Sequence, residues 1–208
     1  MAESNVVIDI SHHNATVNLK TAREKSGVVG VIHKASQGQG YVDPTYKSNR
    51  KKAQDVGMLW GAYHFGTGSD GITQAEHFLS VVQPASDTLL VLDLEANPQG
   101  PNMTLVEARA FVTHVKAVTG RPPGLYSGHY IKALLGNTSD PVLGECWFWL
   151  AQYGPTAVVP PAWQTWTMWQ YTDGGLGPEP HAVAGVGRCD RDKFQGTEEE
   201  LRTFWSQG

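Results

Sequence analysis

The amino-acid sequence predicts an α/β fold in which eight strands close into a barrel that forms a single domain. Segments typical of buried strands alternate five times with segments typical of helices, which indicates a parallel sheet. Three more strand-like segments follow without regular helices between them, and eight strands are enough to close a barrel. Carboxylates follow the apolar part of several strands, and a barrel of this kind has its active site at that C-terminal rim.

Size and composition fit one ordinary globular domain that spans residues 1–208, with 40% apolar and 17% charged residues. A net charge of −4 gives no basic field for nucleic acid or for an anionic membrane, and we expect neither partner. No segment approaches the length of a transmembrane span, and no signal peptide is visible. Cys146 and Cys189 are too few for a disulfide framework, so we expect two free thiols.

The first half of the chain is predicted to contain four apolar strands, at Val6–Ile10, Val28–His33, Met58–Phe65 and Thr88–Leu92. Helices are predicted between them, at residues 18–26, 43–56 and 72–82. Gly27 is expected to end the first of these helices. Asp43 and Pro44 are expected to supply the N-cap and the first residue of the second.

The second half is predicted to contain two helices that begin with capping boxes. Thr104 and Glu107 have the spacing of one such box, for a helix that runs to residue 119, and Thr197 and Glu200 have the spacing of another, for a C-terminal helix that ends near Trp205. A short helix is expected at residues 130–135. The remaining four strands are predicted at Gly124–Tyr126, Trp147–Gln152, Thr167–Tyr171 and Val183–Cys189.

Two carboxylates, Asp93 and Glu95, follow the apolar strand that ends at Leu92. Residues i and i+2 of a strand point to the same face, with Cα atoms about 6 to 7 Å apart. Like charges side by side raise one pKa and oppose folding, so the pattern favours chemistry that needs an acid and an anion together. The alternative is a structural pair bonded to neighbouring loops. Asp9 and Asp190 also follow strand-like segments.

Two other patterns invite a functional interpretation that the sequence does not favour. His12 and His13 suggest a metal site, but adjacent side chains diverge and no third ligand has a telling spacing, so we expect a solvated loop. The glycine-rich segment 37–40 lacks the Gly-Lys-Ser/Thr ending of a phosphate-binding loop. We therefore expect no metal and no cofactor.

The chain resembles the glycoside hydrolase family 25 muramidases, the Chalaropsis-type lysozymes, along nearly its whole length. Each motif is weak alone, but their order is specific. The motifs are Val7-Ile8-Asp9-Ile10-Ser11, Lys34-Ala35-Ser36-Gln37-Gly38, Val42-Asp43-Pro44, residues 53–57, Gly61-Ala62-Tyr63-His64-Phe65, Asp93-Leu94-Glu95, Leu125-Tyr126-Ser127-Gly128, Trp149-Leu150-Ala151-Gln152-Tyr153, Trp169-Gln170-Tyr171 and Cys189-Asp190.

This resemblance implies an irregular (β/α)5(β)3 TIM-like barrel that hydrolyses the β-1,4 bond between N-acetylmuramic acid and N-acetylglucosamine in bacterial cell-wall peptidoglycan. By the same resemblance, Glu95 is the general acid, and Asp93 is the carboxylate that stabilises positive charge or orients the substrate's acetamido group. The substrate-binding residues that it implies are Asp9, Asp190, Tyr63, Tyr126, Trp149 and Gln170. The spacing of Asp93 and Glu95 fits either a retaining or an inverting enzyme.

Two positions depart from the family pattern. Gln37 stands where the family often has Glu, and Asp192 stands where the last strand often reads D-x-N. Neither change removes a catalytic group, and we expect Asp190 rather than Asp192 to be functional.

Two other functions remain open from the sequence. One is a metal-dependent barrel hydrolase, with Asp9, Asp93, Glu95, Asp190 and His64 as ligands. The other is a non-catalytic glycan-binding module. In the muramidase interpretation we expect a monomer that acts on the cell wall, reached either by release like that of a phage endolysin or by secretion through another route.

Overall fold

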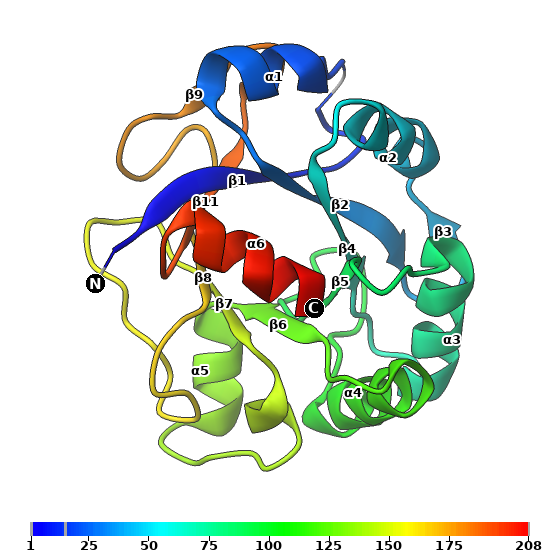
Figure 1. Ribbon diagram of the computed structural model, residues 1–208. Helices are drawn as coiled ribbons and strands as arrows, with labels where there is room; N and C mark the ends of the chain where they lie inside the picture. The colour runs from blue at the N-terminus through cyan, green and yellow to red at the C-terminus, as the bar shows by residue number, and fades with distance from the viewer. Residues whose placement is uncertain (1, 15, 208) are drawn as a thin grey trace.

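The computed structural model describes residues 2–14 and 16–207, and it confirms the predicted α/β barrel (Figure 1). Eight strands form a closed sheet, because the first strand of the chain is hydrogen-bonded to the second strand on one side and to the last strand on the other. In order around the barrel these strands are β1 (Ser4–Ile10), β2 (Gly30–Gln37), β4 (Leu59–Phe65), β5 (Leu89–Asp93), β6 (Gly124–Ser127), β7 (Phe148–Ala151), β8 (Met168–Thr172) and β11 (Asp190–Phe194).

Five α-helices connect the first six barrel strands, and none follows β7 or β8. The helices are α1 (Leu19–Ser26), α2 (Tyr46–Asp55), α3 (Gly71–Val82), α4 (Leu105–Thr119) and α5 (His129–Leu135). A single 3-10 turn, η1 (Leu143–Glu145), precedes β7. The smaller strands are β3 (Tyr41–Val42), which pairs with β2, and the pair β9 (Ala182–Val183) and β10 (Gly187–Arg188). This is the predicted succession of five βα units and three further strands.

The prediction for the last barrel strand is wrong. Residues 182–188 form the small β9–β10 hairpin instead, and the barrel strand is β11, which runs antiparallel to both β8 and β1. Its sequence, Asp190-Arg191-Asp192-Lys193-Phe194, lacks the apolar run that marks the other strands. Since an antiparallel strand begins where its parallel neighbours end, Asp190 still lies at the C-terminal rim.

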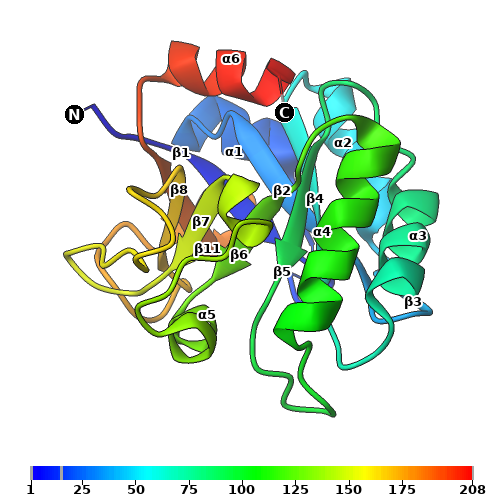
Figure 2. The ribbon, with the colours of Figure 1, turned by 90° about the horizontal axis from the view of Figure 1, so that it is seen from below.

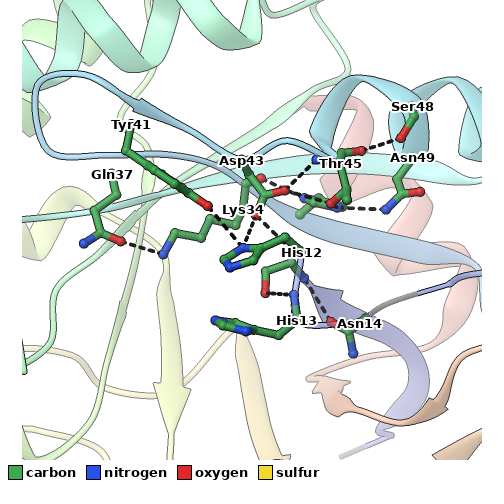
Figure 3. Close-up of polar contacts among 12 residues, drawn as sticks. His12, His13, Asn14, Lys34, Gln37, Tyr41, Asp43, Thr45, Ser48 and Asn49 are labelled. Atoms are coloured by element: carbon green, nitrogen blue, oxygen red, sulfur yellow. Dashed lines mark hydrogen bonds and ion pairs between the residues drawn. The ribbon is translucent and has the colours of Figure 1, made fainter.

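The helix ends largely follow the predicted local signals. Gly27 adopts a left-handed conformation after α1, and both predicted capping boxes form. The predicted start of α2 is wrong by two residues, because the N-cap is Thr45 rather than Asp43 and the helix begins at Tyr46. Asp43 instead accepts hydrogen bonds from the backbone and hydroxyl of Thr45 and from His12, which tie the β3–α2 connection to the loop after β1 (Figure 3).

The C-terminal helix α6 (Glu198–Gln207) closes the N-terminal end of the barrel, and Figure 2 shows it across the end opposite the β5–α4 loop. Its Trp205 is fully buried among the inward-facing residues of the barrel, and the indole Nε1 donates to the Trp60 carbonyl at 3.0 Å. Gly30 and Gly61 make room for the ring, since a Cβ at Gly30 would lie 2.8 Å from it. One end of the barrel is therefore filled by apolar side chains, which leaves the other end for polar ones.

Both cysteines are free and buried, as predicted. Within residues 2–14 and 16–207, no helix has the length and apolar character needed to cross a membrane.

Candidate active site

A cavity of about 200 Å³ opens at the C-terminal rim of the barrel, and it is polar. All eight residues predicted to form the site line it, together with one that was not predicted, Tyr153. Most are supplied by the strand ends around the rim. The lining residues are Asp9, Tyr63, Asp93, Glu95, Tyr126, Trp149, Tyr153, Gln170 and Asp190.

Tyr153 lies two residues beyond the end of β7, just as Glu95 lies two residues beyond the end of β5. It is part of the quoted motif Trp149–Tyr153, and alternation from Trp149 through Ala151 places it on the same face, just as alternation from Asp93 places Glu95. Its position at a C-terminal strand end is the signal that could have identified it.

Asp93 and Glu95 face the same cavity, as the strand alternation predicts, while the intervening Leu94 is buried in the apolar core. Burial and the neighbouring charge of Glu95 raise the pKa of Asp93 well above its ordinary value, and Lys34 counteracts this rise. Burial also raises the pKa of Glu95. Because two negative charges at this distance would repel each other, the pair favours a state in which one of the two carboxyl groups holds a proton.

Gln170 connects two tyrosines to Asp9 by hydrogen bonds. Its Oε1 accepts from the hydroxyls of Tyr126 at 2.7 Å and Tyr153 at 3.1 Å, and its Nε2 donates to Asp9 Oδ2 at 2.8 Å. Burial raises the pKa of both phenols, so they remain protonated donors. These directions fix the orientation of the amide, and Asp9 is held as the final acceptor.

Asp192 lies beneath the cavity and is fully buried. Its Oδ1 accepts a hydrogen bond from the Trp149 indole at 2.8 Å, its Oδ2 is buried without a hydrogen-bond partner, and its charge acts on the neighbouring Asp9. Two buried carboxylates close to each other repel, which favours protonation of one of them. Burial raises the pKa of both groups, so the pair is expected to hold one proton.

Asp190 is partly exposed at the cavity, whereas Trp149 is almost completely buried. Burial, reinforced by the charge of Asp173, raises the pKa of Asp190 to about 6. Trp149 is only 1% exposed, and Tyr126 packs edge-on against it with ring centroids 4.7 Å apart. The indole therefore forms the floor of the cavity rather than an open platform.

His64 does not reach this cavity. It is fully buried on the outer side of β4, where its ring stacks on Phe111 and is hydrogen-bonded to Ser36 and Gln74. Burial lowers its pKa to about 3, so the ring is neutral. Among the described residues, no group of three or more His, Cys, Asp or Glu side chains is arranged to hold a metal ion.

Larger cavities flank the central one on both sides of the β5–α4 loop. The first, of about 640 Å³, lies over the loops that follow β6, β7 and β8, and it shares Glu95 and Tyr153 with the central cavity. The second, of about 560 Å³, lies over the loops that follow β1, β2 and β4 and is also lined by residues 97–99. An elongated ligand that spanned the rim would thus cross Asp93 and Glu95 near its middle.

The comparison with known families agrees with this geometry. The model of the glycosyl hydrolases family 25 matches residues 8–179. The chain belongs to glycosyl hydrolase family 25. It is therefore a glycoside hydrolase, and the resemblance inferred from its motifs is confirmed.

Individual members of family 25 are similar over most of the chain. Lysozyme M1 of Streptomyces globisporus is 31% identical over 93% of this chain and 69% of its own length. A solved bacterial lysozyme from Streptomyces coelicolor has a TM-score of 0.86 and 30% identity, covering 99% of both chains. A family 25 lysozyme from Aspergillus fumigatus has a TM-score of 0.84 and 31% identity, covering both chains completely.

Proposed function

We propose that this chain is a peptidoglycan hydrolase, a lysozyme of the N-acetylmuramidase type, that cleaves the β-1,4 bond between N-acetylmuramic acid and N-acetylglucosamine. The observation that carries the proposal is the Asp93–Glu95 pair in the polar rim cavity of a family 25 barrel, with a larger cavity on either side. The names of similar family members, among them lysozymes from bacteria and a fungus, support the same substrate class.

Glycosidic cleavage requires a proton for the leaving oxygen and negative charge near an oxocarbenium-like transition state. We assign the proton to Glu95, because it is the more exposed of the pair and lies where the central cavity meets a flanking one. Asp93, which is buried in the floor, supplies the negative charge. Glu95 can hold the proton while Asp93 is ionised, and the positive charge of Lys34 favours that distribution.

Asp93 acts on the sugar in one of two ways, by stabilising positive charge at the anomeric carbon or by orienting the 2-acetamido group for attack on it. Asp9 and Asp190 complete the acidic floor, while Tyr63, Tyr126, Trp149 and Gln170 shape the sugar site. Comparing the loss of kcat in Asp93→Asn on substrates with and without the acetamido group separates the two roles. Only an acetamido-orienting role predicts that the loss depends on that group.

The decisive experiment is to incubate the purified protein with peptidoglycan and to identify the new reducing-end sugar by mass spectrometry. A muramic acid end is expected. A glucosamine end or a cleaved peptide would overturn the proposed bond specificity, and binding without any turnover would support the glycan-binding alternative. We also propose that the protein acts on the cell wall as a monomer, which size-exclusion chromatography of the active protein tests.

A further inference from the structure

The flanking cavity over the loops after β1, β2 and β4 differs in charge from the catalytic cavity beside it. It contains no Asp or Glu in its lining but has one lysine and two histidines, whose arrangement Figure 3 shows. Its lining residues are His12, His13, Lys34, Gln37, Tyr41, Phe65, Asn97, Pro98 and Gln99. The catalytic cavity, in contrast, is lined by four carboxyl groups.

Lys34 is the cation of this cavity, and no carboxylate of residues 2–14 and 16–207 forms an ion pair with it. Its ammonium group donates to the neutral Oε1 of Gln37 at 2.7 Å. It also lies 5.0 Å from the ring centroid of Phe65 and 5.7 Å from that of Tyr41. Neither an amide nor an aromatic face neutralises the charge, so the ammonium keeps donor capacity for an anion.

The two histidines are held in place beside this lysine. The backbone and ring Nδ1 of His12 donate to Asp43 Oδ2, and the His13 ring lies 4.0 Å from the His12 ring (Figure 3). Burial alone would raise the pKa of Asp43, but its hydrogen bonds from His12 and Thr45 hold it below its ordinary value. Asp43 is therefore an anion whose acceptor atoms are already occupied by His12 and Thr45, and it forms no ion pair with Lys34.

We propose that this cavity binds a carboxylate of the peptide stem carried by the muramic acid residues of the substrate. The proposal rests on the proposed function, because peptidoglycan combines neutral amino sugars with anionic peptides. The acidic catalytic cavity suits the sugars and repels a carboxylate. An anion that lies along the same cleft is instead stabilised beside Lys34, where a charge-assisted hydrogen bond can form.

The test compares kcat/KM on soluble, uncross-linked glycan strands whose stem carboxylates are either free or converted to amides. For the wild type, the free acid is expected to react about tenfold faster, the value of one charge-assisted hydrogen bond. This advantage should shrink as salt is added. Lys34→Gln should lose the advantage and Lys34→Arg should keep it. For each variant, kcat/KM on the free-acid strands is divided by kcat/KM on the amidated strands. This ratio cancels the separate effect of Lys34 on Asp93.

Lys132→Gln is the matched control, since Lys132 also donates to a glutamine side chain, at 3.0 Å from Gln152 Oε1, but does not line this cavity. It should keep the wild-type ratio. A wild-type ratio near one, or an unchanged ratio in folded Lys34→Gln, would overturn the proposal. The proposal would also be overturned if Lys34→Gln lowered kcat/KM only on amidated strands that carry a phosphodiester polymer. The anion bound by the cavity would then be a phosphate and not a stem carboxylate.

Failure of the proposed function gives a different result, because no strand of either kind would then be cleaved. In that case the affinity of Glu95→Gln for the free-acid and amidated strands, measured by titration calorimetry, tests the cavity directly. Tighter binding of the free acid that is lost in the Glu95→Gln, Lys34→Gln double variant supports the carboxylate site. Equal binding of both strands refutes it.

Discussion

Replacing Asp192 by asparagine is expected to make stability less sensitive to pH. Asparagine keeps an oxygen to accept from the Trp149 indole but removes one of two neighbouring buried carboxyl groups, and with it the charge that raises the pKa of Asp9. In the wild type this pair retains one proton after folding, whereas both groups lose theirs in the unfolded chain above about pH 4. The folded state thus binds more protons, and its stability falls as pH rises until the pair ionises.

The magnitude follows from proton linkage. Each pH unit in this window changes the free energy of unfolding by about 1.4 kcal/mol for one proton, so Asp192→Asn should gain about 2 kcal/mol relative to the wild type between about pH 5 and pH 6.5. For a chain of this size, that corresponds to a relative rise in melting temperature of about 4 to 8 °C.

The assay is thermal unfolding of both proteins across this pH range, followed by circular dichroism. Asp55→Asn is the control, because Asp55 is an exposed partner of Lys51 and should leave the pH dependence unchanged. Parallel stability curves for Asp192→Asn and the wild type would refute the retained proton.

Three further expectations concern single side chains. Glu95→Gln should abolish turnover while leaving the melting temperature within a few degrees of the wild type; a folded variant that still clears cell walls at a near wild-type rate would contradict the assignment. Tyr126→Phe removes one of two hydroxyl donors to Gln170 and should lower kcat/KM about threefold to tenfold by the value of one hydrogen bond, with a larger loss when Tyr153→Phe is added; unchanged steady-state kinetics in the double variant would contradict this role. Trp205→Ala should cost about 3 to 5 kcal/mol of stability in a denaturant titration, because it empties the closed end of the barrel; a loss below about 1 kcal/mol would contradict that packing.

The parts of the molecule that the sequence predicts correctly are those whose signals are local. An apolar run followed by Asp93 and Glu95 is visible because strand alternation requires only neighbouring residues. The capping box at Thr104 and Glu107 is visible for the same reason, as the interacting groups are three residues apart. The alternation of strands and helices then suffices for the barrel class.

The features that escaped prediction depend on contacts between distant segments. In β11, Arg191 and Asp192 are both buried, although charged residues in sequence favour an exposed loop. Their burial is explained only by the neighbouring strands, because Arg191 bonds Asn5 and the Ala182 carbonyl while Asp192 bonds Trp149. The start of α2 is similar, since the bond from His12 that engages Asp43 spans 31 residues.

The carboxyl groups at the rim share one residue type but differ in their neighbours, and the neighbours decide their tasks. Asp192 is fully buried outside the lining of the cavity, so a proton that it holds beside Asp9 is unsuited to transfer. Glu95 has no side-chain hydrogen bond to any of the described residues and borders the larger neighbouring cavity, while Lys34 favours ionisation of Asp93 beside it. The transferable proton of the Asp93–Glu95 pair is thus separate from the proton held by Asp9 and Asp192. Lys34 favours Glu95 as the carrier of the transferable proton.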